Sequence, residues 1–184
     1  MTSAWDEIEK TLVDLYSLPH NRINLRGTSP EAEAKKKLNE IKSGIGSAAP
    51  EDYHGPALFL RVVGPTNRAY SGEWWFEAKL LDDLDSAFSR IYFNDVDKKR
   101  VLRDMLRDLL AVSQEWNMIH EVWALELPQG QVLRGYWGSG NAQQLIAGAP
   151  LSAKGNRKLV GKARQIFFPV KNPLWIRRYQ NLLP

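Results

Sequence analysis

The chain has 184 residues, of which 43% are hydrophobic, with no cysteine and a formal net charge of +4. This length fits a single domain with a substantial core, and the lack of cysteine excludes disulfides, thiolate metal sites and a cysteine nucleophile. The small net charge hides an asymmetry, because residues 128–184 contain nine Lys or Arg and no acid, whereas residues 1–127 contain sixteen basic and twenty-one acidic side chains.

Two helices are predicted near the start of the chain. Ser3 is suited to cap the first helix, and the apolar residues after it recur at helical spacing until Pro19. Ser29, followed by Pro30, opens the second helix by the same rules, and Gly44 marks its end. We expect these helices to precede the main body.

Residues 43–56 are rich in Gly, Ala, Ser and Pro and are interpreted as a linker. We therefore divide the chain into an N-terminal helical segment, residues 1–53, and an α+β body, residues 54–184. Residues 1–10 are acidic and amphipathic, which differs from a classical signal peptide. No run approaches the roughly 18 apolar residues that span a bilayer, so we expect no membrane association.

The body is predicted to begin with strands over residues 58–63 and 73–79. Residues 83–93 are predicted to form either a helix or a turn. A wide apolar stripe then predicts a long helix over residues 95–116, with Lys, Arg and Asp covering its outer side.

After that helix the pattern becomes extended. Residues 121–127 alternate as a strand, residues 128–130 form a tight turn, and residues 131–136 are the return arm of a hairpin. Residues 135–140, with the sequence GYWGSG, are interpreted as a flexible aromatic loop, and residues 165–170 as the final strand. Together these elements predict an α+β fold with a mostly antiparallel sheet.

Several enzyme signatures are absent from the sequence. It has no Walker phosphate loop, no dinucleotide glycine fingerprint, no His-Glu-x-x-His pair and no G-x-S-x-G elbow. Zinc and serine hydrolysis are therefore disfavoured, and we expect no metal site. His20, His54 and His120 are far apart in sequence, so each is interpreted as a surface or structural residue.

Arg61 lies in the middle of the first predicted strand of the body, between Leu60 and Val62. A guanidinium placed there has to be paired with an acid or has to face an anion, because an unpaired buried charge is prohibitive. Two interpretations stay open, namely an internal salt bridge and a phosphate group of a ligand.

The residues that follow Arg61 favour a ligand pocket. Gly64 and Ser71 bracket a loop where backbone can approach a ligand, and the Ser71 hydroxyl can donate to a ribose or phosphate oxygen. Trp74 and Trp75 are adjacent, so in a strand one belongs to the core and the other can stack on a flat ring. We assign Trp75 to the pocket and take Glu73 as the candidate if a carboxylate participates.

The basic segment includes a loop in which cations crowd around two glycines just before the last predicted strand. These cations are Lys154, Arg157, Lys158, Lys162 and Arg164. A run of charge is ordinarily a solvated face, but the missing acid favours an anionic ligand or partner. Arg164 stands immediately before the strand and is therefore a candidate ligand contact.

The order of these motifs resembles bacterial polymorphic-toxin domains, and more narrowly NAD glycohydrolase toxins related to the tuberculosis necrotizing toxin. The resemblance covers residues 58–170 and depends on four motifs, which are RVVG at 61–64, GEWW at 72–75, LPQG at 127–130 and GKARQIFFP at 161–169. These toxins belong to the wider ADP-ribosyltransferase-like fold, so the resemblance implies a split, mostly antiparallel sheet behind the N-terminal helical segment.

The resemblance also implies an activity and residue roles. In such families a first-strand arginine holds the dinucleotide phosphates and a glutamine at the start of a late strand acts near the nicotinamide ribose, and Arg61 and Gln165 occupy these positions here. The implied enzyme hydrolyses the nicotinamide–ribose bond of NAD(P), its substrate, with no further cofactor. The candidate site comprises Arg61, Gln165 and Glu73 as catalytic residues, with Gly64, Ser71, Trp75 and Arg164 against the dinucleotide.

Other functions stay open. An ADP-ribosyltransferase toxin that modifies a macromolecule is similar in fold, although the last third holds no glutamate for transfer. A nucleic-acid-binding or RNase toxin module would use the basic segment and its aromatic residues, and a third option is a non-enzymatic interaction domain. As a toxin, the protein would be secreted or delivered into a target cell, would act in its cytoplasm, and would meet an acidic immunity protein in the producing cell.

Overall fold

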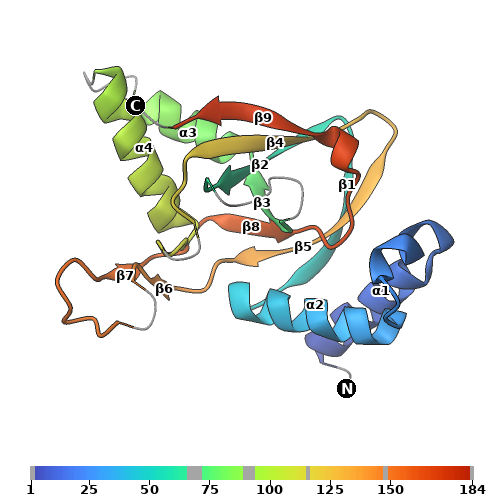
Figure 1. Ribbon diagram of the computed structural model, residues 1–184. Coiled ribbons are helices and arrows are strands. Elements are labelled where there is room, and N and C mark those ends of the chain that lie inside the picture. The colour runs from blue at the N-terminus through green and yellow to red at the C-terminus, as the bar shows by residue number, and fades with distance from the viewer. Residues whose placement is uncertain (1–2, 66–71, 89–93, 115–116, 147–148, 183–184) are drawn as a thin grey trace.

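The computed structural model describes residues 3–65, 72–88, 94–114, 117–146 and 149–182, and Figure 1 shows how their elements are arranged. The helices are α1 (Ala4–Ser17), α2 (Pro30–Gly44), α3 (Lys79–Phe88) and α4 (Asp95–Leu109), with 3-10 turns η1 (Pro19–Leu25) and η2 (Pro173–Trp175). The strands are β1 (Ala49–His54), β2 (Ala57–Val63), β3 (Trp74–Glu77), β4 (Glu121–Leu127), β5 (Val132–Ser139), β6 (Gln143–Gln144), β7 (Lys158–Leu159), β8 (Arg164–Phe167) and β9 (Ile176–Asn181). Ser71, residues 89–93 and Trp116 lie outside the described residues.

Helices α1 and α2 begin where their caps predict. The Ser3 hydroxyl accepts from the amide of Asp6 at 3.2 Å while the Asp6 carboxylate accepts from the Ser3 amide at 2.8 Å, which is a capping box. Ser29 caps α2 by accepting from the Ala32 amide. The two helices pack on each other, and their buried faces share one apolar cluster with Tyr136 of β5 and Phe167 of β8.

The interpretation of residues 43–56 as a linker is wrong. Residues 49–54 form β1, which pairs antiparallel with β5 from Ala49 opposite Trp137 to His54 opposite Val132. Pro50 is compatible with this strand because β1 lies at the edge of the sheet, where strands tolerate proline. The division between residues 53 and 54 falls within β1.

Seven strands form one sheet in the order β1-β5-β8-β3-β2-β4-β9, and every described pair is antiparallel. The predicted α+β class and mostly antiparallel sheet are thereby confirmed. The predicted hairpin of residues 121–136 is wrong, because both edges of β4 are occupied by β2 and β9. After residues 128–130 the chain instead crosses to the far side of the sheet, where β5 pairs with β1 and β8 (Figure 1).

Two further boundaries differ from expectation. Strand β5 runs to Ser139, so most of the segment 135–140 is paired strand rather than a flexible loop. Strand β8 is not the last, because β9 follows it and pairs with β4. The sequence of β9 lacks a clear apolar alternation, which is why periodicity alone did not predict it.

Helices α3 and α4 lie at the other side of the molecule from α1 and α2 (Figure 1). Leu102 and Leu106 of α4 pack with Leu60 and Val62 of β2 in a second apolar cluster. Helix α4 ends at Leu109 rather than near residue 116. Ala111 adopts a left-handed φ of 49°, a conformation that interrupts the helix.

The pairing of β2 with β3 is short. Phe59 is opposite Glu77 and Leu60 is opposite Phe76, whereas Trp74 and Trp75 of β3 pair with β8 on the other edge and have no partner in β2 among the described residues. Within the described residues the two strands therefore form a fork, and its open end faces the start of β3 and the end of β2.

Candidate functional site

A cavity of about 250 Å³ lies at the fork between β2 and β3. Four parts of the chain form its wall: the end of α2, the facing parts of β2 and β3, the segment after α4, and the region from the end of β5 to β8. The residues that line it are Ser43, Gly44, Arg61, Val62, Trp74, Trp75, Phe76, Leu110, Ala111, Val112, Asn117, Asn141, Gln143 and Gln165. The cavity thus brings together Arg61, Trp75 and Gln165, although Arg61 and Gln165 are 104 residues apart in the sequence.

Arg61 supplies the guanidinium of this cavity. Burial lowers the pKa of Arg61, while the nearby carboxylate of Glu73 acts in the opposite direction. The guanidinium lies against Gly72, since a Cβ added to Gly72 would overlap its carbon and both terminal nitrogens. A guanidinium at the wall of a cavity is a group to which an anionic ligand can bind.

Gln165 reaches the cavity from the second position of β8. Its side-chain nitrogen donates to the carbonyl of Leu110 at 2.9 Å, which orients the carboxamide. The same nitrogen lies against Gly140, where an added Cβ would overlap it. Because Gly72 and Gly140 have no side chain, the Arg61 guanidinium and the Gln165 side-chain nitrogen can occupy the space where a Cβ would otherwise lie.

The two tryptophans share the cavity wall but differ in environment. Trp75 is 1% exposed, and its indole nitrogen donates to the carbonyl of Gly72 at 3.2 Å. Trp74 is partly exposed and packs edge-to-face on Phe167, with ring centroids 5.0 Å apart. Both residues line the cavity, and Trp74 is the ring with exposed surface on which a flat ligand can stack.

Four predicted site residues lie apart from the cavity wall or outside the described residues. Gly64 follows β2 and faces Asn117, and Ser71 is not described. The Glu73 carboxylate pairs with Lys37 of α2 at 3.0 Å. Arg164 is on the opposite face of β8 from Gln165, because adjacent strand residues alternate.

Arg164 belongs to a separate polar cluster. Its guanidinium pairs with Glu51 and, at 3.4 Å, with Glu77, and it donates to the Tyr53 hydroxyl at 3.1 Å. It also lies over the ring of Trp137, 4.2 Å from the centroid. Through these contacts Arg164 of β8 joins β1, β3 and β5, so its guanidinium has a role in holding the sheet together.

The segment after α4 forms a cavity wall that the sequence did not predict. Arg107, expected on the outer side of α4, is 5% exposed and donates to the carbonyls of Val112 and Asn117 at 2.9 and 3.0 Å. The side-chain nitrogen of Asn117 donates to the Val62 carbonyl at 2.9 Å, and its side-chain oxygen accepts from the Ile119 amide at 2.8 Å. No periodic signal marks such a wall, because it depends on hydrogen bonds between distant segments.

The basic last third is compensated by acids from earlier in the chain. Five of its nine cations form ion pairs, which join Arg134 to Asp52, Arg157 to Asp108, Arg164 to Glu51, Arg177 to Glu126 and Arg178 to Glu121. The sheet and the end of α4 bring these partners together. Lys154, Lys158 and Lys162 are exposed, and no ion pair is found for them among the described residues.

Among the described residues, no group of three or more His, Cys, Asp or Glu could hold a metal ion. No helix formed by these residues is both long and apolar enough to cross a bilayer. Comparison with known proteins adds no relative, since no family model matches the chain and no curated protein matches it.

Proposed function

We propose that the protein is an NAD(P)-consuming toxin effector that hydrolyses the nicotinamide–ribose bond. The observation that carries this proposal is the convergence of Arg61 and Gln165 on one cavity lined by Trp74 and Trp75. A dinucleotide presents the matching groups, which are an anionic pyrophosphate, hydroxyls that accept or donate hydrogen bonds, and flat rings.

The reaction consumes NAD⁺ and water and releases nicotinamide, ADP-ribose and one proton. The bond between C1′ of the ribose and the nicotinamide nitrogen breaks with its electron pair going to nicotinamide, which leaves neutral, so no strong acid is required. Water then adds to the oxocarbenium-like carbon. The protein has to orient the sugar, exclude bulk water and place polar groups around developing charge.

The residues of the cavity fit these tasks. Arg61 would bind the pyrophosphate, and the Gln165 carboxamide would hydrogen-bond a ribose hydroxyl or place the attacking water. Trp74 would cover a ring of the ligand. The cavity, at about 250 Å³, is smaller than the roughly 300–1,000 Å³ of pockets that enclose a whole ligand of drug size, so it would enclose the nicotinamide ribose while the adenosine lies outside.

The fold is compatible with the ADP-ribosyltransferase-like type that the motifs resemble. In support, the antiparallel sheet opens into a fork between β2 and β3, and the cavity lies at that fork. The exposed lysines Lys154, Lys158 and Lys162 give a surface that an acidic immunity protein would match in charge. In this proposal the protein acts in the cytoplasm of a target cell.

The test is incubation of the purified protein with NAD and chromatographic measurement of nicotinamide and ADP-ribose. Equal amounts of both products support hydrolysis, whereas nicotinamide without free ADP-ribose indicates transfer to a macromolecule. Arg61→Ala and Gln165→Ala should each lower the rate at least about tenfold, which corresponds to about 1.4 kcal/mol of transition-state stabilisation. Arg178→Ala, whose guanidinium is exposed on β9, is the matched control. Fully active Arg61→Ala protein would refute the proposal.

A further inference from the structure

The C-terminal end of α2 forms one side of the cavity. Ser43 and Gly44 line it beside Trp74. A Cβ added to Gly44 would overlap two carbons of the Trp74 indole, so the helix end and the ring are in direct contact. The N-terminal helical part is therefore a structural component of the site.

The same helix end is tied to the segment that supports Gln165. Ile45 pairs with Gly140 in an isolated bridge, and the Asn141 amide donates to the Gly44 carbonyl at 2.7 Å. The Asn141 side chain donates to the carbonyls of Lys42 and Ser43 at 3.3 and 3.1 Å. Asn141 thus satisfies carbonyls that a helix leaves without partners at its C-terminus.

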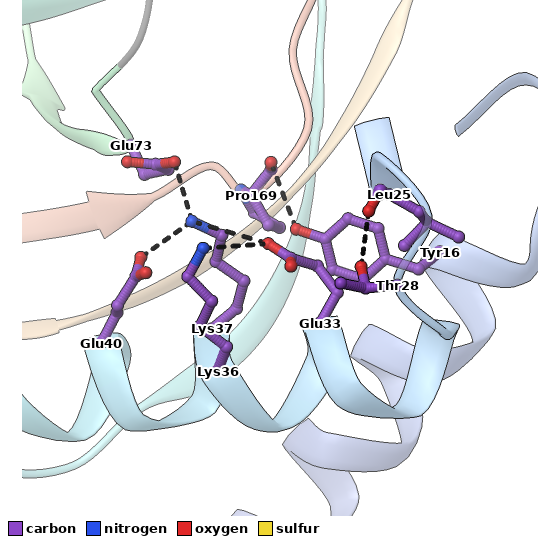
Figure 2. A network of polar contacts seen from close by, with 9 residues as sticks. All are labelled: Tyr16, Leu25, Thr28, Glu33, Lys36, Lys37, Glu40, Glu73 and Pro169. Atoms are coloured by element: carbon purple, nitrogen blue, oxygen red, sulfur yellow. Dashed lines mark hydrogen bonds and ion pairs between the residues drawn. The ribbon is translucent and has the colours of Figure 1, made fainter. Parts of the chain in front are cut away.

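One ion pair joins the middle of α2 to the turn that precedes β3. The Lys37 ammonium lies 3.0 Å from Glu73 and 2.9 Å from Glu40, with Glu33 at 4.0 Å (Figure 2). Lys37 is only 8% exposed, and its stem also places the ammonium 5.9 Å from the Phe167 ring centroid. Burial opposes its charge, but the carboxylates of Glu40 and Glu73 outweigh burial and raise the pKa of Lys37.

Glu73 is placed between two residues that control the cavity. Gly72 lies against the Arg61 guanidinium and Trp74 lines the wall, so Glu73 is adjacent in the chain to both. The Glu73 carboxylate also interacts electrostatically with Arg61 and with Lys171. Lys37 thus holds in an ion pair a carboxylate whose charge also acts on Arg61.

We propose that Lys37 is a positioning residue, which holds Glu73 on the α2 side and thereby leaves the Arg61 guanidinium directed at the ligand phosphates. This inference depends on the proposed function. Without the ammonium, Glu73 turns toward Arg61 and draws the guanidinium from the cavity, while the carboxylates of Glu33 and Glu40 lose their shared cation. The loss therefore weakens the binding of the phosphates.

The experiment compares Lys37→Met with Lys36→Met, a control on the same helix whose side chain is 63% exposed. The measurements are the dissociation constant for ADP-ribose by calorimetry, KM and kcat for NAD, and the melting temperature. Lys37→Met should raise the dissociation constant and KM at least about tenfold, with kcat changed less. Lys36→Met should match the wild type. Lys37→Arg, which keeps the charge, should recover most of the affinity.

The double variant Lys37→Met/Glu73→Gln separates positioning from a merely structural role. Removing the carboxylate also removes the competitor for Arg61, so the double variant should bind ADP-ribose more tightly than Lys37→Met alone. A double variant that binds as weakly as the single variant, or more weakly, overturns the inference.

A crystal structure of Lys37→Met distinguishes failure of the inference from failure of the proposed function. We expect the Glu73 carboxylate within about 4 Å of the Arg61 guanidinium, the usual limit for an ion pair. An unmoved Glu73 overturns the inference whatever ligand the cavity takes. Wild-type protein that neither binds ADP-ribose nor releases nicotinamide overturns the proposed function, and with it the assigned ligand phosphates.

Discussion

The Arg61 guanidinium lies against Gly72, so that a Cβ at residue 72 would fall far inside the 3.0 Å that real Cβ atoms keep from other atoms. The overlapped group is the far end of a flexible side chain, which can move at small cost. Gly72→Ala is therefore expected to displace the guanidinium and to change the free energy of unfolding by less than about 1 kcal/mol.

The functional consequence of Gly72→Ala should be large. We expect nicotinamide release to fall at least about tenfold, because the guanidinium leaves the position from which we propose that it binds phosphate. The control is the same substitution in an Arg61→Ala background, where it should cost nothing further. Additive losses in the double variant would mean that Gly72 acts by another route.

Gly140→Ala is expected to act on Gln165 in a related way. The new methyl group would overlap the side-chain nitrogen and would lie 3.2 Å from the carbonyl of Gly161. The hydrogen bond from Gln165 to Leu110 is then lost, which costs about 1 kcal/mol of stability. We expect kcat for nicotinamide release to fall toward that of Gln165→Ala while KM changes little, as steady-state kinetics will show. An unchanged kcat would argue against a catalytic role for the carboxamide.

Lys171 should make stability depend on pH. Burial, together with the nearby cations Arg61 and Lys37, lowers the pKa of Lys171 from 10.5 to about 8, although Glu73 opposes the shift. Between these values the unfolded chain binds more protons than the folded chain, so the free energy of unfolding rises with pH across this window. Below pH 8 the folded protein bears the cost of a partly buried charge.

Lys171→Met should therefore stabilise the protein at pH 7 by about 2 kcal/mol, after allowance for partial solvation. The advantage over the wild type should decline from pH 8 upward and vanish near the ordinary lysine pKa of 10.5. Urea unfolding of both proteins at several pH values tests this prediction. Subtracting the wild-type free energy of unfolding from that of the variant cancels the contributions of titratable groups that both proteins contain. A difference that does not vary with pH would contradict the prediction.

Leu12→Ala tests whether residues 1–53 unfold separately from residues 54–184. Leu12 is fully buried in the cluster that also contains Tyr136 and Phe167. We expect a loss of about 2–5 kcal/mol, typical of a buried leucine, in a single transition seen equally by circular dichroism and tryptophan fluorescence. Two transitions, with only the first shifted by the substitution, would show that the helical segment unfolds independently.

Salt dependence tests the nucleic-acid alternative. Because five of the nine cations of the last third are paired with acids, Lys154, Lys158 and Lys162 are the main exposed cations left for phosphates in its described part. If single-stranded RNA binds, the slope of log K against log salt should be about −2, rather than the roughly −6 expected from nine contacts. A filter-binding series from 50 to 200 mM salt measures it, and a steep slope would favour the nucleic-acid function.

Local sequence determined several parts of this protein by itself. Ser3 and Ser29 start α1 and α2 because a hydroxyl at a helix N-cap satisfies amides that the helix leaves without partners. Residues 121–127 form β4 as alternation predicts. Arg61 could be selected as a candidate because an apolar strand rarely holds a charged group in its middle, whereas the role of Gln165 came from the resemblance alone.

Tertiary structure decided which strands meet, which charges pair and which side chains share the cavity. The predicted hairpin is wrong because strand pairing depends on the arrangement of the whole sheet, in which β4 pairs with β2 on one edge and β9 on the other. Five of the nine cations of the last third pair with acids far away in sequence for the same reason. Lys37, an ordinary helix-surface residue by pattern, became buried against Glu73 only when α2 packed on the sheet. Local interactions depend on neighbours within a few residues, whereas pairing and burial depend on contacts that close long loops, and residue periodicity does not encode those contacts.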